Sequence, residues 1–313
     1  MNPRHQKLYR ALKLARNDIA CVVDGGLFND VHCVIKAGEH FYIKSFSDQA
    51  KALSFPPLPT TALQRYEIAV ALHEQAQTVV TSNVYVPRLM AVDLENRAIA
   101  MEGAKGIYLF EYMVNQATFS LAVERVAHVL IWLKSFHELK NSNTPILKIN
   151  SEAFKRYKTI LQYQKSFEFL QSKNLEEANA FLNEHLTIEE TLLHGDLNSR
   201  NIIICEDGRI AIIDFEQGQL GCGTHDAAYL ISEIVIAASV IDEDIEAVIN
   251  LLWHCYEIDT RNITKYRRFR RHLSFQVLYR LKGPSQAIWT GHLNDKVKAN
   301  IDAWCAQEFS SRL

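Results

Sequence analysis

The residues of this 313-residue chain that are best suited to chemistry flank one short hairpin. His194-Gly195-Asp196-Leu197-Asn198-Ser199-Arg200-Asn201 precedes it, and Asp214-Phe215-Glu216 follows it. The strand-like segments 202–205 and 209–213 are joined through Asp207-Gly208, a pair suited to a tight turn. The hairpin is therefore expected to bring Asp196, Asn201 and Asp214 to one mouth. Two carboxylates and an amide oxygen are hard ligands that suit Mg²⁺, which takes its remaining oxygens from water and phosphates.

The spacing H-x-D-x-x-x-x-N followed by D-F resembles the catalytic loop and metal motif of the protein-kinase-like superfamily. Two departures are informative. Gly195 replaces the arginine of protein kinases, and Glu216 replaces the last glycine of their metal motif. With these residues the chain is similar to the aminoglycoside phosphotransferase family, which phosphorylates small molecules. Residues 221–226 resemble that family's glycine-plus-aspartate element, so a long regulated activation loop is not expected.

The resemblance also implies where a nucleotide binds. Lys44 falls on the third strand, where the family places the lysine that reaches the α- and β-phosphates of ATP. Glu67 belongs to a helix that starts with a capping box at Thr61 and Gln64. It lies on the stripe formed by residues 63, 66, 70 and 73, which we expect to face inward. A buried carboxylate needs a cation, so we predict that Glu67 pairs with Lys44.

Two further segments are implied as nucleotide contacts. Gly25, Gly26 and Asn29 stand in a strand–turn–strand that could cover the phosphates, although an ordinary hairpin turn explains them equally well. Glu102 and Ala104 fall at the family's interlobe hinge, where backbone groups bind adenine.

The remaining pattern predicts an α+β, bilobal, protein-kinase-like fold. Strands are expected over 19–23, 31–35, 41–46, 87–92 and 98–102, and an apolar helix over 121–139, with helices filling the chain from 226 onward. We place the small β-rich N-lobe at residues 1–102 and the larger, mostly helical C-lobe at 103–313.

Composition narrows the class of protein. Hydrophobic residues make up 48% and charged residues 22%, which is typical of a soluble globular enzyme. A formal charge of -2 gives no reason to expect a nucleic-acid partner. The apolar stretch 229–241 is too short to span a membrane, so no membrane association is expected. Six cysteines without a C-x-x-C pair indicate reduced thiols and a cytoplasmic protein.

The resulting hypothesis is ATP-dependent transfer of the γ-phosphoryl group to a hydroxyl of a small molecule. Asp196 would orient the acceptor hydroxyl and take its proton, while Asn201 and Asp214 would hold Mg²⁺. His194 and His137 are expected to be structural. Two alternatives stay open: a protein serine/threonine kinase, and a nucleotide-binding regulator without turnover.

The acceptor and the choice between ATP and GTP are not readable from the sequence. The acidic run 242–246 would suit a cationic acceptor and the basic run 265–271 an anionic one. Each run is equally typical of a solvated helix face.

Overall fold

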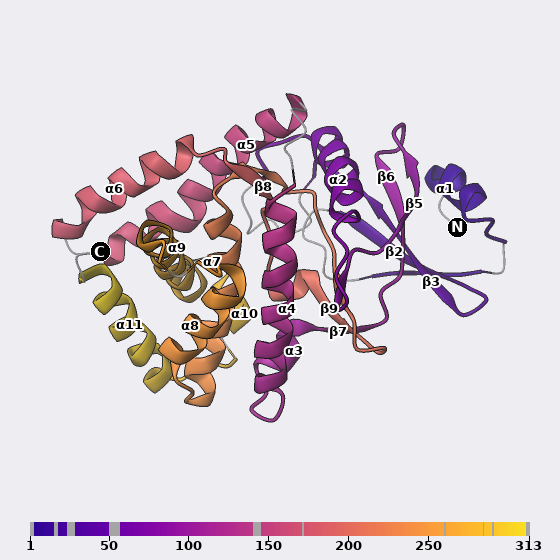
Figure 1. Ribbon diagram of the computed structural model, residues 1–313. Coiled ribbons are helices and arrows are strands. Elements are labelled where there is room, and N and C mark those ends of the chain that lie inside the picture. Colours follow the sequence, from indigo (N-terminus) through magenta and orange to yellow (C-terminus); the bar gives the residue numbers. More distant parts are fainter. Residues whose placement is uncertain are drawn as a thin grey trace.

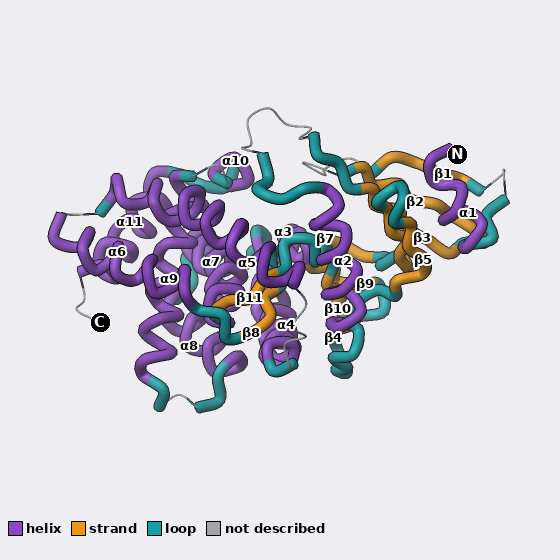
Figure 2. Tube along the Cα trace, turned by 90° about the horizontal axis from the view of Figure 1, so that it is seen from above, coloured by secondary structure: helices purple, strands orange, loops and turns teal. Residues whose placement is uncertain are grey.

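The computed structural model describes residues 3–15, 18–23, 29–49, 57–139, 145–170, 172–259, 261–283, 285–289 and 291–310. Strands gather on one side of the molecule and helices on the other, and two views at right angles agree on this arrangement (Figures 1 and 2). The predicted α+β, bilobal architecture is confirmed. The position of the boundary at residue 102 stays a prediction.

The first sheet is antiparallel and five-stranded, in the order β1-β2-β3-β6-β5. Its strands follow the predicted ranges closely: β1 (Ile19–Val22), β2 (Asp30–Lys36), β3 (Glu39–Ser45), β5 (Leu89–Asp93) and β6 (Ala98–Glu102). A short N-terminal helix, α1 (Gln6–Ala11), packs Leu8 and Tyr9 on this sheet. Helix α2 (Ala62–Ala76) packs Tyr66 and Ala69 against Phe46 and Ile99. Its predicted capping box between Thr61 and Gln64 is confirmed.

A second, four-stranded sheet carries the predicted hairpin and has the order β4-β10-β9-β7. Its strands are β4 (Val84–Tyr85), β7 (Gly106–Tyr108), β9 (Ile202–Cys205) and β10 (Ile210–Ile212). Strands β9 and β10 are antiparallel with Ile202 opposite Ile212. A further pair joins β8 (Thr191–Leu193) to β11 (Gln219–Gly221). Residues 194–201, which we call the catalytic loop, therefore leave one strand pair and enter the other.

Helices make up most of the chain beyond the first sheet. They are α3 (Leu109–Met113), α4 (Phe119–His137), α5 (Pro145–Lys158), α6 (Ser172–Thr187), α7 (Gly223–Ile241), α8 (Ile245–Tyr256), α9 (Ile263–Lys282), α10 (Gln286–Trp289) and α11 (Asp295–Ser310). Short helices of other types are η1 (Pro3–His5), η2 (Thr159–Tyr163, a π-helix), η3 (Gln164–Phe169) and η4 (Ser199–Asn201). Helices α4 and α7 contribute more residues to the largest hydrophobic core than any other element does.

Helix α7 begins three residues earlier than expected, and its 19 residues make it long and apolar enough to cross a membrane. The prediction that this stretch is too short is therefore wrong. Burial explains the apolar composition of α7, since 89% of its most apolar segment lies inside the folded chain. A helix that is apolar on all sides is what the centre of a large helical lobe requires.

The two charged runs that pointed to opposite acceptors are paired within the helical lobe. Arg270 of the basic run binds Glu246 of the acidic run at 2.7 Å and also contacts Glu308. Arg268 reaches Glu184 at 2.6 Å. Helices α8 and α9 lie on the side of the lobe remote from the first sheet (Figure 1). Neither run therefore specifies the acceptor, and the interpretation as ordinary helix faces is the better one.

Candidate active site

The catalytic loop places Asp196 and Asn201 side by side. The Asn201 amide nitrogen donates to the Asp196 carbonyl at 2.8 Å. The Asp196 carboxylate accepts hydrogen bonds from the Tyr229 hydroxyl and the Gln217 amide, each at 3.2 Å. Burial raises the pKa of Asp196, Lys158 opposes this shift, and Asp214 adds to it. Asp196 is thus a fixed carboxylate whose orientation is set by residues from three segments of the chain.

Asp226, near the start of α7, holds the backbone of the catalytic loop. Its carboxylate accepts from the amides of His194 at 2.6 Å and Gly195 at 3.1 Å. Burial alone would raise the pKa of Asp226, but hydrogen bonds from His137 and His225 hold it far below its usual range. His194 packs on Phe215 and bonds the Ile213 carbonyl, which confirms its structural role. His137 is buried and bonds Asp226 and Tyr256, as expected of a structural residue.

The hairpin carries Asp214 to the same mouth. Strand pairing continues past Ile212 through a bond from the Ile213 amide to the Asn201 carbonyl at 3.0 Å. Asp214 itself has a φ of 73°, in the left-handed region that few non-glycine residues adopt. Backbone strain of this kind clusters at functional sites, where surrounding contacts hold it in place. The turn directs the Asp214 carboxylate at the opposite lobe.

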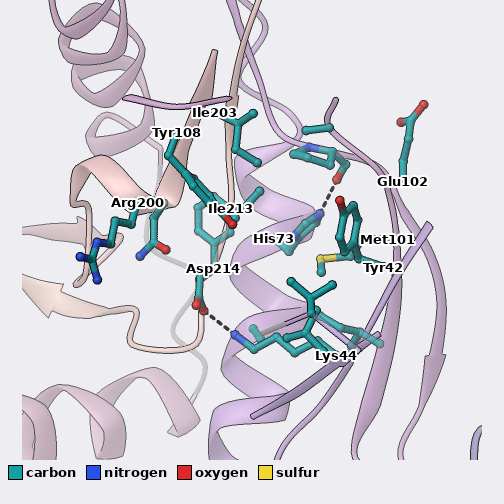
Figure 3. Close-up of a pocket in the computed structure, with 18 of the residues that line it drawn as sticks. Tyr42, Lys44, His73, Met101, Glu102, Tyr108, Arg200, Ile203, Ile213 and Asp214 are labelled. Carbon is teal, nitrogen blue, oxygen red and sulfur yellow. Dashed lines mark hydrogen bonds and ion pairs between the residues drawn. The ribbon is translucent and has the colours of Figure 1, made fainter. Parts of the chain in front are cut away.

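Lys44 meets that carboxylate from strand β3. Its Nζ lies 2.6 Å from Asp214 Oδ1 and 3.5 Å from Glu216 Oε2, and the lysine is buried (Figure 3). Burial lowers the pKa of Lys44, but Asp214 and Glu216 outweigh it and raise that pKa overall. Burial would raise the pKa of Asp214, yet Lys44 holds it below its usual range. The structure therefore brings Lys44 of the first sheet into direct contact with Asp214, which follows the hairpin.

The predicted contact between Lys44 and Glu67 is wrong in this structure. The buried face of α2 includes Arg65, Ile68 and Leu72, so it is rotated from the expected stripe, and Leu63 is 41% exposed. Glu67 is only half-buried, and among the described residues the carboxylates in ion-pair contact with Lys44 are those of Asp214 and Glu216. Successive helix residues differ by about 100°, so a one- or two-position error turns a side chain away from its target.

Glu216 takes the place expected for Glu67. Its Oε2 accepts a hydrogen bond from Asn29 Nδ2 at 2.7 Å and lies 3.8 Å from Arg65 Nε. Arg65 is 1% exposed and donates to the carbonyls of Thr60 and Ser47. Helix α2 thus contributes a buried cation rather than an anion, and the carboxylate comes from the residue two positions after Asp214.

A cavity of about 470 Å³ opens between the lobes beside these groups. Lys44, Asn201, Asp214, Glu102 and Ala104 all line it. Its walls are apolar on both sides, with Ile203 and Ile213 on one side facing Tyr42 and Met101 on the other (Figure 3). A slot between apolar side chains with polar groups at one end suits a flat ring joined to an anionic chain.

The other residues predicted to contact the nucleotide differ in where the structure places them. The Glu102 side chain points away from the cavity in Figure 3, which leaves a role for its backbone only. Asn29 is buried and tied to Glu216. Gly25 and Gly26 lie outside the described residues, so their predicted role stays a prediction.

The donor set suits Mg²⁺ better than a metal held entirely by protein. No group of three or more His, Cys, Asp or Glu side chains with metal-site geometry occurs within the described part of the chain. Magnesium commonly takes one or two protein ligands and completes its shell with water and phosphate oxygens. The Asn201 amide nitrogen is engaged by Asp196, and Asn201 and Asp214 both line the cavity. These residues therefore fit the metal when phosphates supply the remaining ligands.

Fold and site together define a bilobal, kinase-like phosphotransferase. A family model described as "Phosphotransferase enzyme family" matches residues 34–257. The chain therefore belongs to this family. No curated protein matches the chain in sequence.

Solved structures share the fold. An ethanolamine kinase from Plasmodium vivax is 14% identical with a TM-score of 0.58, over 99% of this chain and 90% of that one. The ADP-bound aminoglycoside phosphotransferase APH(2'')-Ib is 13% identical with a TM-score of 0.54, over 97% and 96%. A choline kinase from Cryptosporidium parvum is 13% identical with a TM-score of 0.52, over 93% and 88%.

Proposed function

We propose that this protein transfers the γ-phosphoryl group of ATP to a hydroxyl of a small molecule, with Mg²⁺ bound at Asn201 and Asp214. The observation that carries the proposal is the convergence of Lys44, Asn201 and Asp214 on one interlobe cavity, with Asp196 bonded to Asn201. The names of two structural relatives, one ADP-bound and one a complex with ATP and streptomycin, support a nucleotide as donor.

Each residue has a distinct task in this proposal. Lys44, kept in place by Glu216, neutralises charge on the α- and β-phosphates. Asn201 and Asp214 hold the metal, which when bound neutralises charge on the phosphates. Asp196 accepts a hydrogen bond from the acceptor hydroxyl and receives its proton as the oxygen attacks. Positioning and charge neutralisation supply most of the rate in such transfers.

A small-molecule acceptor fits this chain better than a protein one. Only residues 217–222 separate Glu216 from the start of α7, and three of them form strand β11. No segment remains there that could serve as a long docking and activation loop. The alternative of a protein kinase therefore has no observation in its favour.

The test is incubation of the purified protein with Mg²⁺ and γ-labelled ATP, and separately GTP, across a panel of hydroxyl compounds. Ethanolamine, choline and aminoglycosides enter the panel from the names of the structural relatives, and sugars, homoserine and nucleosides extend it. Label transfer to at least one acceptor is expected. Asp196→Ala should lower kcat by about 10³-fold or more while nucleotide affinity is kept. Nucleotide binding without transfer to any acceptor would favour the silent regulator.

A further inference from the structure

A buried lysine that belongs to none of the sequence motifs lies against the catalytic loop. Lys158 is the last residue of α5 and is 2% exposed. Its ammonium donates a hydrogen bond to the Gly195 carbonyl and lies 5.2 Å from the centre of the Tyr229 ring. Among the described residues, no carboxylate lies within 4.0 Å of its Nζ. A buried cation without an ion-pair partner is costly, which calls for an explanation.

Both contacts of Lys158 lead to Asp196. Gly195 precedes Asp196 in the chain and has a φ of 81°, so its carbonyl direction is part of the turn that presents the carboxylate. Tyr229 donates its hydroxyl to Asp196 Oδ1 at 3.2 Å while its ring faces the ammonium. Lys158 thus touches the backbone and the side chain that fix Asp196. Its positive charge also lowers the pKa of Asp196, against the rise in that pKa that burial causes.

The backbone after Lys158 departs from a regular helix. The π-helical turn η2 begins at Thr159, directly after the lysine. Such insertions are rare and occur frequently at functional sites, because they re-aim side chains on the preceding turn.

We propose that Lys158 is a positioning residue for phosphoryl transfer: it holds the Gly195 carbonyl and the Tyr229 ring so that the Asp196 carboxylate faces the acceptor hydroxyl. The inference rests on the proposed function. It adds to the site a residue from α5, which lies outside the sequence motifs on which the proposed function is based.

Lys155 provides a matched control one helical turn earlier. It is also 2% exposed and donates to a carbonyl, that of Ile188, but its neighbouring carboxylate is Glu189 at 3.7 Å rather than Asp196. We compare Lys158→Met with Lys155→Met, using the acceptor that gives the highest rate. Lys158→Met should lower kcat about 100-fold, as loss of one preorganised donor does, with the KM for ATP changed less than about twofold. Lys155→Met should keep kcat within about threefold.

Conservative replacement separates positioning from general stability. Lys158→Arg should recover at least about tenfold of the lost kcat, because a guanidinium can donate to the same carbonyl. An unchanged kcat in Lys158→Met, or equal losses in the two methionine variants, would overturn the proposal. If Lys158→Met does not fold, Tyr229→Phe keeps the ring and removes the hydroxyl. It should lower kcat about tenfold, and an unchanged kcat would count against the inference.

A failure of the proposed function can be distinguished from a failure of the proposed role of Lys158. If the wild-type protein binds Mg·ATP but phosphorylates no acceptor, hydrogen–deuterium exchange of residues 194–199 tests the role of Lys158 without turnover. Faster exchange in Lys158→Met than in Lys155→Met supports it, and equal exchange refutes it.

Discussion

Replacing Glu216 by glutamine separates the ion-pair arrangement of this structure from the one expected by sequence. Glutamine keeps the size of the side chain and an oxygen that can accept from Asn29, but removes the charge that faces Lys44 and Arg65. Glu67→Gln removes a charge from the half-buried position that was expected to play the same part. The two variants differ only in which carboxylate is lost.

The size of the effect follows from burial and distance. The Glu216 side chain is 6% exposed and lies 3.5 Å from Lys44 Nζ. Two unit charges at that separation attract by about 5 kcal/mol at an effective dielectric constant of about 20. Desolvation offsets part of this, so we expect a net loss of about 1.5–3 kcal/mol in nucleotide binding, which corresponds to a roughly 10- to 100-fold rise in the Kd for Mg·ATP. For Glu67→Gln the expected change is below about 0.5 kcal/mol.

The assay is calorimetric titration of each variant with ATP in excess Mg²⁺, with thermal unfolding as a check of folding. If Asp214 held Mg²⁺, Glu216 would be the carboxylate left to pair with Lys44, so its loss should weaken binding. A Glu67→Gln variant with the larger loss of affinity, or a Glu216→Gln variant that binds like wild type, would refute this reasoning.

Two further predictions concern stability and the catalytic loop. Burial holds the pKa values of His185 and His272 well below their usual range, so these histidines stay neutral when folded but become charged in the unfolded chain below pH 6.5. Their contribution to stability is present above pH 6.5 and is lost as the pH falls. In urea unfolding, a His185→Gln/His272→Gln variant should therefore lose about 3 kcal/mol less unfolding free energy than wild type between pH 7.5 and 5.5; equal losses in the two proteins would contradict the assignment. Gly195→Ala should lower kcat by about 100-fold or more with ATP affinity kept, because a Cβ there would lie 2.0 Å from the Gln217 carbonyl oxygen; a kcat within about threefold of wild type would contradict the geometry.

Much of the site could be predicted because most of its polar residues lie close together in the sequence. Asp196, Asn201 and Asp214 flank one hairpin, and a hairpin with a tight turn fixes which residues lie together. Lys44 could be placed because its position on the third strand matches the resemblance. The first sheet was predictable because β-rich runs were separated by clear turn signals.

The residues that hold the site residues in place could not be predicted, because their contacts join segments that are distant in the sequence. Whether Arg65 or Glu67 faces the active site depends on a rotation of α2 that the apolar pattern determines poorly. Leu63 is as apolar as Ile68 and Leu72, yet it is exposed and they are buried. Glu216 was noticed as a departure from the kinase motif, yet nothing local indicates that it meets Asn29, 187 positions earlier. Lys158 reaches Gly195, and Tyr229 reaches Asp196, only once α5 and α7 are packed beside the catalytic loop.

Calorimetric titration with ATP, in the presence and absence of Mg²⁺, tests the central claim most directly when wild type, Asp214→Asn and Asp196→Asn are compared. Wild type and Asp196→Asn should bind Mg·ATP with similar affinity, whereas Asp214→Asn should lose the gain in affinity that Mg²⁺ provides. Absence of measurable binding to wild type by either ATP or GTP with Mg²⁺, or a Mg²⁺ effect that survives in Asp214→Asn, would contradict the assignment of this crevice as a magnesium-nucleotide site.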